Sequence, residues 1–246
     1  MFDVITFGSA TRDVFLRSKA MELHREHGLV EACFVFGAKL NVEEIILETG
    51  GGGTNNAVTF SRMAKMRTAV VTKIGADSPG EDIIKALKKE RVATEFVQHD
   101  SRGTTGYSSI ILSGNAERTI LTYRGVSSEI DAARIPWQKL KAKLFHVSSL
   151  GGDLALFDRI IVHARRLGAK VYWNPGLNEL TRGVSVLAPF LKRIDLVSLN
   201  RDEAALLTNK KTADLRGIIK SMRRLAADSI ITDGEKGAYA VSSKSV

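Results

Sequence analysis

The sequence has little cysteine or proline and no long apolar run. Its 246 residues include one cysteine, Cys33, and four prolines. A single cysteine excludes an internal disulfide and favours a reducing, cytoplasmic location. No apolar run approaches the roughly 20 residues that a membrane-spanning helix needs. The apolar stretch at residues 2–7 follows no basic segment, so it indicates a buried first strand rather than a signal peptide.

Positive charge is in excess, with 36 Lys and Arg against 27 Asp and Glu, a net charge of +9. A basic protein can bind nucleic acid. Tyrosine and tryptophan do not interleave with the basic residues, which argues against a stacking platform for single strands. We therefore expect solvated helix faces, a diffuse attraction for anionic ligands such as nucleotides, and no specific nucleic-acid binding. The positive residues lie in scattered pairs: Lys88-Lys89, Arg165-Arg166, Lys192-Arg193, Lys210-Lys211 and Arg223-Arg224.

Short apolar runs alternate with segments of helical periodicity. Apolar faces with helical spacing occur within residues 83–87, 157–164 and 215–225. Alternating strands and helices predict an α/β fold with a mostly parallel sheet and helices on both faces. The expected buried strands are residues 2–7, 69–74, 144–147, 171–173, 194–199 and 229–232.

Two stretches, residues 31–48 and 105–124, contain strand-like runs with no helix between them. In the second, Ser113-Gly114-Asn115 is typical of a hairpin turn. We predict a small antiparallel sheet, with strands within 12–48 and 103–125, attached to a single domain that spans 1–246. Such a sheet could be a lid that excludes water from the chemistry, or the interface of a homodimer, and the two roles are compatible.

A run of four glycines, Gly50 to Gly53, precedes the helical segment that begins near Thr54. Glycine lets the backbone approach a ligand closely, and a helix N-terminus offers unpaired N–H donors. By itself the run could equally be a flexible turn. It is not a Walker A loop, because no Gly-Lys-Ser/Thr follows.

Other motifs accompany the glycine run in a fixed order. The set resembles the ribokinase family of carbohydrate kinases, also called the PfkB family, from residue 1 to about residue 240. The resemblance implies a three-layer α/β/α Rossmann-like core with a small β-sheet lid. It also implies ATP- and Mg²⁺-dependent phosphorylation of a hydroxyl of a sugar or nucleoside. The motifs are Gly8-Ser9 with Asp13, GADSPG at 75–80, Asn174-Pro175-Gly176, NRDE at 200–203 and TDGEKG at 232–237.

The resemblance implies a substrate site formed by Asp13, Gly51, Gly52 and Asn55. A carboxylate can accept hydrogen bonds from two hydroxyls at once, which suits Asp13 to a vicinal diol. The backbone at Gly51 would lie against the sugar, and Asn55 would contact its hydroxyls. The residues alone leave two alternatives open: Asp13 as a solvated loop acid and Asn55 as a helix N-cap.

The resemblance places Asn200, Glu203, Thr232 and Gly234 at the nucleotide. Glu203 would organise the water shell of Mg²⁺ rather than ligate it directly, because magnesium retains several waters. The alternatives are that Asn200 and Glu203 simply start a helix, and that Thr232 and Gly234 form a tight turn. We interpret the motif at 75–80 as a turn into a helix rather than a substrate contact.

The resemblance also implies a second signature, roughly D-T-x-G-A-G-D. Its glycine turn would stabilise the transferring phosphoryl group, and its last aspartate would deprotonate the acceptor hydroxyl. Residues 1–246 do not contain it, so we expect a C-terminally truncated fold with the base beyond Val246 and little phosphoryl transfer. Asp153, after two glycines, is expected to be a helix N-cap, and His146 a satisfied core residue rather than a base.

Two functions therefore compete. One is a carbohydrate or nucleoside kinase, and the other is a non-catalytic sugar- or nucleotide-binding protein of the same fold. Ribose, fructose, a phosphorylated sugar and a nucleoside all stay open as the acceptor. Arg124 either reaches a substrate phosphate or lies on the surface.

Overall fold

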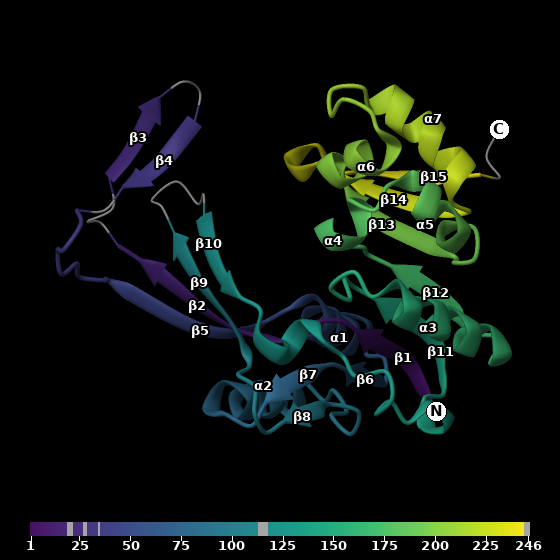
Figure 1. Ribbon diagram of the computed structural model, residues 1–246, viewed down its shortest axis with the longest axis horizontal. Coiled ribbons are helices and arrows are strands. Elements are labelled where there is room, and N and C mark those ends of the chain that lie inside the picture. The colour runs from purple at the N-terminus through teal and green to yellow at the C-terminus, as the bar shows by residue number, and fades with distance from the viewer. Residues whose placement is uncertain (19–21, 27–28, 34, 113–117, 244–246) are drawn as a thin grey trace.

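A seven-stranded sheet forms the centre of the structure, a computed structural model that describes residues 1–18, 22–26, 29–33, 35–112 and 118–243 (Figure 1). Six of its strands are parallel, and the last, at one edge, is antiparallel to its neighbour. The parallel sheet expected from the strand–helix alternation is confirmed. In spatial order the strands are β15 (Ala238–Ser242), β14 (Asp228–Thr232), β13 (Leu196–Asn200), β12 (Lys170–Trp173), β11 (Ala142–Val147), β1 (Phe2–Phe7) and β6 (Thr68–Val71).

Helices cover both faces of this sheet. The helices are α1 (Gly52–Ala64), α2 (Ser78–Lys89), α3 (Leu154–Arg166), α4 (Leu177–Leu180), α5 (Val184–Leu191), α6 (Arg201–Thr208) and α7 (Leu215–Leu225). Phe145 and His146 are consecutive on β11, so their side chains point to opposite faces. Phe145 packs edge-on against His163 of α3, whereas His146 packs against Phe60 of α1. The core therefore has three layers.

The helices form where apolar residues recur at helical spacing. In α3, Leu156, Phe157, Ile160 and Ile161 are all buried, and each buried side chain of this size contributes roughly 1.5–3 kcal/mol. The helix starts at Asp153, whose carboxylate accepts a hydrogen bond of 2.8 Å from the Leu156 N–H. The predicted helix and the predicted N-cap role of Asp153 are both confirmed.

The prediction of one strand at residues 69–74 is wrong in one respect, because the chain forms two strands there, β6 and β7 (Lys73–Gly75). β6 pairs with β1 in the central sheet, whereas β7 pairs with β8 (Gln98–Asp100) in a separate two-stranded sheet. The carbonyl of Thr72, between the two strands, accepts a hydrogen bond of 2.8 Å from the Gln98 N–H. An apolar run predicts that a strand is buried, but it does not predict that the chain leaves one sheet and joins another.

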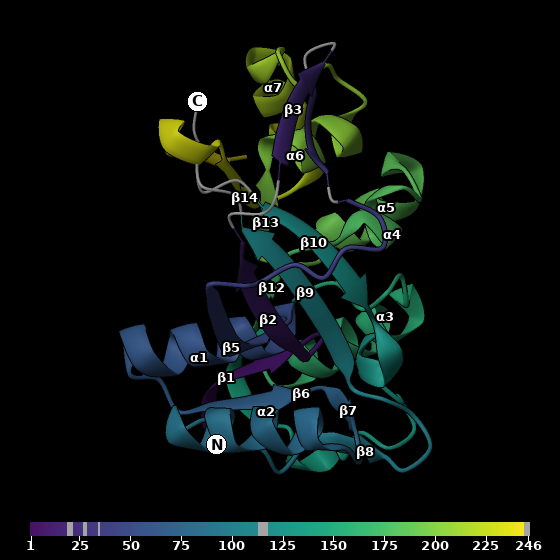
Figure 2. The same ribbon diagram turned by 90° about the vertical axis from the view of Figure 1, so that its left-hand side faces the viewer.

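A four-stranded sheet, here called the lid sheet, projects from one side of the core (Figures 1 and 2). Its order is β10 (Arg118–Tyr123), β9 (Gly106–Leu112), β2 (Thr11–Arg17) and β5 (Glu44–Gly50). Neighbours are antiparallel except β2 and β9, which are parallel, so the sheet is mostly rather than wholly antiparallel. The expected pairing of β9 with β10 is confirmed, and their turn at 113–115 lies outside the described residues.

A second hairpin extends beyond the lid sheet, formed by β3 (Glu22–Glu26) and β4 (Leu29–Cys33). Three short 3₁₀ helices complete the secondary structure at Gly125–Ser128, Trp137–Lys139 and Gly234–Lys236. Among the described residues, no helix combines the length and the apolar character that a membrane crossing requires.

Candidate functional site

The glycine run lies where the residues that follow β1 contact the start of α1. A Cβ on Gly53 would lie 2.6 Å from the Gly8 carbonyl oxygen, so the two backbones are in direct contact. The Gly53 N–H donates to the Ser9 carbonyl at 3.0 Å, and the Thr6 hydroxyl donates to the Gly53 carbonyl at 2.9 Å. These bonds hold the run in one conformation, so it is not a flexible turn.

Gly51 is the N-cap of α1 and has φ of 96°, which L-residues other than glycine rarely adopt. A Cβ there would also lie only 2.4 Å from the Ser9 carbonyl oxygen. At Gly52 the neighbour is Ser148, whose Cβ would lie 2.7 Å from an added Cβ. Glycine therefore lets the N-terminus of α1 pack directly against Ser9 and Ser148, and the Gly52 N–H donates to the Ser9 hydroxyl at 3.3 Å.

Asp13 lies beside this run. It is a half-buried residue of β2, not a solvated loop acid, so that alternative is wrong. The Thr11 hydroxyl donates to its Oδ1 at 2.8 Å, and a Cβ on Gly50 would lie 1.9 Å from its Oδ2. The structure thus places the Asp13 carboxylate against the segment that leads into Gly51 and Gly52.

Asn55 is placed differently. It is exposed on α1, and its N–H donates to the Gly51 carbonyl, so Gly51 rather than Asn55 is the N-cap and the capping alternative is wrong. With Glu48 and Thr59 it lines a groove of ≈ 420 Å³. The next residue, Asn56, donates to the Gly52 carbonyl at 2.7 Å and to the Ser148 hydroxyl at 3.1 Å.

The nucleotide-side residues come together at the ends of β13 and β14. Asn200 and Thr232 are paired Cα positions on these neighbouring strands. Asn200 and Glu203 form a capping box: the Asn200 side chain accepts from the Glu203 N–H, and Glu203 Oε2 accepts from the Asn200 N–H, each at 2.8 Å. Both residues therefore do start a helix. Gly234 has φ of 55° and no heavy atom within 4 Å of an added Cβ, so the turn after Thr232 is open.

Glu203 is the carboxylate of the Asn200–Glu203 capping box that could hold magnesium or one of its waters. The described part of the chain contains no group of three or more His, Cys, Asp or Glu that could hold a metal ion. Magnesium in phosphoryl-transfer sites is held by one or two carboxylates with waters and substrate phosphates, so such a group is not required. Glu203 is partly exposed, and its capping bond uses one of its two carboxylate oxygens.

Both groups of residues lie on one edge of the sheet. Gly8 follows β1, Ser148 follows β11, and Asn200 and Thr232 end β13 and β14. Because these strands are parallel, their carboxyl ends share an edge, where ligands of open α/β sheets bind. With strands about 4.8 Å apart, β1 and β13 are separated by roughly 14 Å. That span allows a small acceptor and a nucleotide to lie side by side.

Arg201 connects the segments that carry the residues expected at the nucleotide, and the sequence did not indicate this role. Its guanidinium forms a 2.9 Å ion pair with Asp233, and both side chains are largely buried, at 19% and 12% exposure. Its Nε also donates to the Thr212 carbonyl at 2.7 Å. The start of α6 is thereby joined to the turn after β14 and to the loop before α7.

Asp77 joins the core to the lid sheet. It is the N-cap of α2, which confirms the motif at 75–80 as a turn into a helix. Its carboxylate accepts from the Gly80 N–H at 3.0 Å and from the Thr105 N–H at 2.8 Å, directly before β9. Burial alone would raise the pKa of Asp77, but the hydrogen bonds from Thr105 and Gly80 outweigh it and hold the pKa below its usual value.

His146 is buried, as expected, but it is not satisfied. Its Nδ1 has no hydrogen-bond partner within the described ranges. Burial lowers the pKa of His146 to about 4, so the ring is neutral at pH 7. It packs against Phe60 on the α1 side of the sheet and is not among the residues that surround Gly52.

An α/β core with a lid sheet, and with polar groups gathered at the carboxyl edge beside a glycine-rich helix N-terminus, is the arrangement of the ribokinase-like class of small-molecule kinases. The family model described as pfkB family carbohydrate kinase matches residues 1–246, and the chain belongs to this family. The predicted family is therefore confirmed. Mouse ribokinase is 28% identical over 182 residues, which cover 72% of this chain and 54% of the mouse protein. The match thus spans about half the length of that relative.

Solved structures show the same fold. Ribokinase from Arabidopsis thaliana, complexed with ribose and ATP, has a TM-score of 0.74 at 18% identity, covering 99% of this chain and 76% of that one. A nucleoside kinase from Burkholderia thailandensis, in complex with inosine, has a TM-score of 0.74 at 15% identity, covering 98% and 74%. The central parallel sheet with helices and a mostly antiparallel lid sheet is therefore a ribokinase-like fold.

Proposed function

We propose that the protein to which residues 1–246 belong transfers a phosphoryl group from ATP to a hydroxyl of a sugar or nucleoside, with the base supplied by the D-T-x-G-A-G-D signature that these residues do not contain. The observation that carries the proposal is the position of Asp13 beside Gly50, directly before Gly51 and Gly52 at the N-terminus of α1. The carboxylate would accept hydrogen bonds from acceptor hydroxyls, and the backbone of Gly51 and Gly52, which has no side chains, would let the acceptor lie close to it. Family membership supports the reaction class, and the structures with ribose, inosine and ATP support the ligand classes.

The nucleotide would lie along the ends of β13 and β14. Asn200 and Thr232 would face its phosphates, and the open turn at Gly234 would let the nucleotide approach the backbone. Glu203 would hold a water of the Mg²⁺ shell. Bound Mg²⁺ supplies charge neutralisation for the phosphate oxygens. A cytoplasmic location, where ATP is plentiful, completes the proposal.

The central test is Asp13→Asn. The amide has the same shape but loses the negative charge and one acceptor, so charge-assisted hydrogen bonds to the acceptor become weaker. We expect acceptor affinity to fall about 10- to 100-fold, or about 1.4–2.8 kcal/mol. Isothermal titration calorimetry with ribose, fructose, adenosine and inosine measures this change, and ATP affinity should not change.

The matched control is Asp228→Asn, which makes the same substitution at the amino end of β14. It should leave acceptor binding as it is in the unaltered protein. Phosphate-product formation, followed by ³¹P nuclear magnetic resonance, separates the two competing functions. Turnover supports the kinase. Acceptor binding without turnover supports the non-catalytic binding protein where the protein assayed contains the D-T-x-G-A-G-D signature, because the expected base belongs to that signature. Unchanged acceptor affinity in Asp13→Asn would remove Asp13 from the site.

The lid sheet also supports the proposal of a homodimer. On the face opposite Asp13, Ile45, Leu47 and Leu121 are 61%, 51% and 60% exposed. Leu121 lies on β10 and Ile45 and Leu47 on β5, the two edge strands, so the exposed apolar side chains flank this face of the sheet. Exposed apolar surface of this kind can mark an interaction site. A second copy of the same sheet could cover this face.

We expect Leu121→Lys to shift a dimer towards monomer, because burying one leucine contributes roughly 1.5–3 kcal/mol and a buried lysine charge is costly. Sedimentation velocity across a concentration series measures the shift. Thr122→Lys, one residue along β10 and on the other face, is the control. A wild-type protein that stays monomeric at all concentrations contradicts the dimer.

A further inference from the structure

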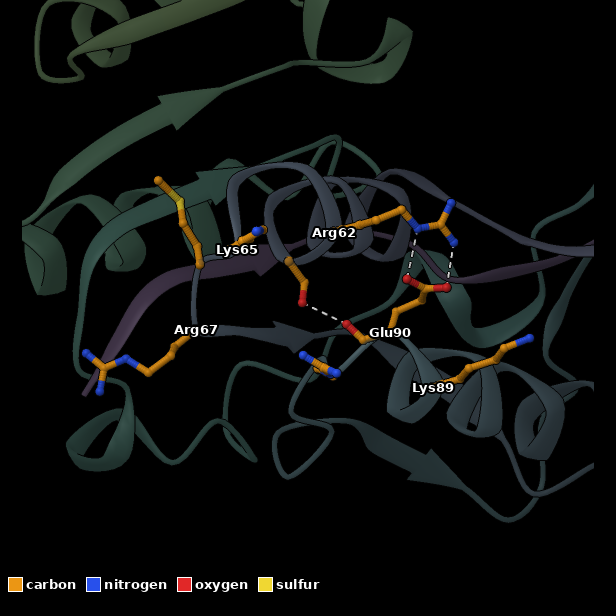
Figure 3. A pocket seen from close by; sticks show the side chains of 8 residues that line it. Arg62, Lys65, Arg67, Lys89 and Glu90 are labelled. Carbon is orange, nitrogen blue, oxygen red and sulfur yellow. Dashed lines mark hydrogen bonds and ion pairs between the residues drawn. The ribbon is translucent and has the colours of Figure 1, made fainter.

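A basic cavity lies at the end of α1 remote from the glycine run (Figure 3). Its volume is ≈ 500 Å³, and it lies between the C-terminal ends of α1 and α2. Since α1 has 13 residues, each rising about 1.5 Å, the cavity is roughly 20 Å from Gly51. It is therefore remote from Gly51 and Gly52, although Arg62, Lys89 and Glu90 also line the groove beside Asn55, whereas Lys65 and Arg91 line the cavity and not that groove. Its charged lining residues are Arg62, Lys65, Arg67, Lys89, Glu90 and Arg91.

Positive charge in this cavity is mostly unbalanced. The one carboxylate, Glu90, is held by the Arg62 guanidinium, with Nε at 2.9 Å from Oε2 and a second bond to Oε1. Arg67 pairs with Asp3 at 3.3 Å, outside the cavity lining. Within the described part of the chain, Lys65, Lys89 and Arg91 form no ion pair. Three cations are thus available to a ligand.

Two of these cations have a backbone conformation that stability alone does not favour. Only three described non-glycine residues have positive φ: Lys65 at 52°, Arg91 at 58° and Asn209 at 51°. Asparagine adopts this conformation more readily than lysine or arginine, and glycine is the usual residue beyond a helix end. Unfavourable backbone conformations are concentrated at functional sites. Lys65 is the C-cap of α1 and Arg91 follows the C-cap of α2, so this conformation turns the chain at both helix ends, where the two side chains line the cavity.

The favourable interaction of cations with helix dipoles does not explain all of the positive charges that line the cavity. Cations stabilise a helix from within its last turn, and Arg62 in α1 and Lys89 in α2 already do so. Arg67 and Arg91 lie beyond the helix ends. The walls of the cavity are also held together, because the Ser61 hydroxyl of α1 donates to the Glu90 carbonyl at 2.7 Å.

We propose that this cavity binds a phosphorylated small molecule with at least two negative charges. Lysine and arginine are the side chains that recognise phosphate oxygens, and several around one cavity favour a multiply charged anion. Met66, 37% exposed on the cavity wall, offers an apolar contact to the organic part of such a ligand. The site is independent of the proposed kinase activity.

Titration calorimetry with inorganic tripolyphosphate tests the site at about 0.1 M salt, where surface charges are partly screened. Lys65→Asn and Arg91→Asn remove charge while keeping a residue that tolerates positive φ, so the fold is not strained. We expect each substitution to weaken tripolyphosphate binding about tenfold, and the double variant more. Lys220→Asn, an exposed lysine on α7, is the matched control and should bind as the unaltered protein does.

Equal affinity of the unaltered protein and the double variant for tripolyphosphate would overturn the proposal. So would a loss of duplex DNA binding in the double variant with no loss of tripolyphosphate binding, since that result indicates a nucleic-acid surface. Thermal unfolding of the two asparagine variants checks folding, and their midpoints should equal or exceed that of the unaltered protein. ATP and acceptor affinities should be unchanged, which separates this test from that of the kinase.

Discussion

Replacing Glu179 with alanine should lower the free energy of unfolding by about 3–5 kcal/mol. Glu179 is 1% exposed, and its carboxylate accepts hydrogen bonds from the N–H groups of Leu150, Gly152 and Gly176 at 2.8–2.9 Å. The Ser149 hydroxyl donates to the same carboxylate. Each backbone donor left unsatisfied costs about 1–3 kcal/mol, and relaxation of the loops recovers part of the sum.

Glu179→Gln should lower the free energy of unfolding by less, about 2 kcal/mol. One side-chain oxygen stays as an acceptor, while the amide NH₂ group faces a backbone donor. Urea unfolding at pH 7 measures both changes. The control is Glu95→Gln on the surface, which should stay within about 0.5 kcal/mol of the unaltered protein. A loss below about 1 kcal/mol for Glu179→Ala would mean that water replaces the carboxylate, so the loops do not depend on it.

We expect Gly51→Ala to lower the free energy of unfolding by about 2–6 kcal/mol. Two effects add at this position. The φ of 96° is unfavourable for alanine, at about 1–3 kcal/mol, and the added Cβ would lie 2.4 Å from the Ser9 carbonyl oxygen, with overpacking at a further 1–3 kcal/mol. The N-terminus of α1 would have to move away from Ser9, which changes its position relative to Asp13, so acceptor affinity should fall as well.

Gly183→Ala separates the two effects. Gly183 is the N-cap of α5 and has a similar backbone, with φ of 84° and ψ of 162° against 96° and 143° at Gly51, but an added Cβ would meet no heavy atom within 4 Å. This variant should lose only about 1–3 kcal/mol, the cost of the backbone conformation. Urea unfolding of both variants gives the comparison, and calorimetry with the acceptor gives the binding change. If Gly51→Ala is no less stable than Gly183→Ala, the close approach to Ser9 is unimportant.

Much of the fold was predictable because it depends on local patterns. The apolar face of α7 recurs at Leu215, Ile218, Met222 and Leu225, and a helix is the conformation that gathers such residues on one side. Asp153 and Asp77 precede their helices and cap them as expected. These features need only a few neighbouring residues, so a single sequence contains the information.

The candidate site was predictable in part. The ordered motifs indicated Asp13 and Gly51, and the structure places both beside the start of α1. Their roles in binding stay predictions. Ser148 and Glu179 had no signal in the sequence, because a serine after a strand and a glutamate in a short helix are common. Their importance comes from partners 92 and 27–30 residues away.

The sequence by itself determined the α/β class, the helix starts and the order of the glycine and polar motifs, because residues close in the chain decide these through propensity, capping and periodicity. Only the tertiary structure decided that Asn56 rather than Asn55 contacts Ser148, and that Lys65 and Arg91 share a cavity. Those outcomes depend on how strands and helices pack across the sheet. Packing joins residues that no local pattern relates.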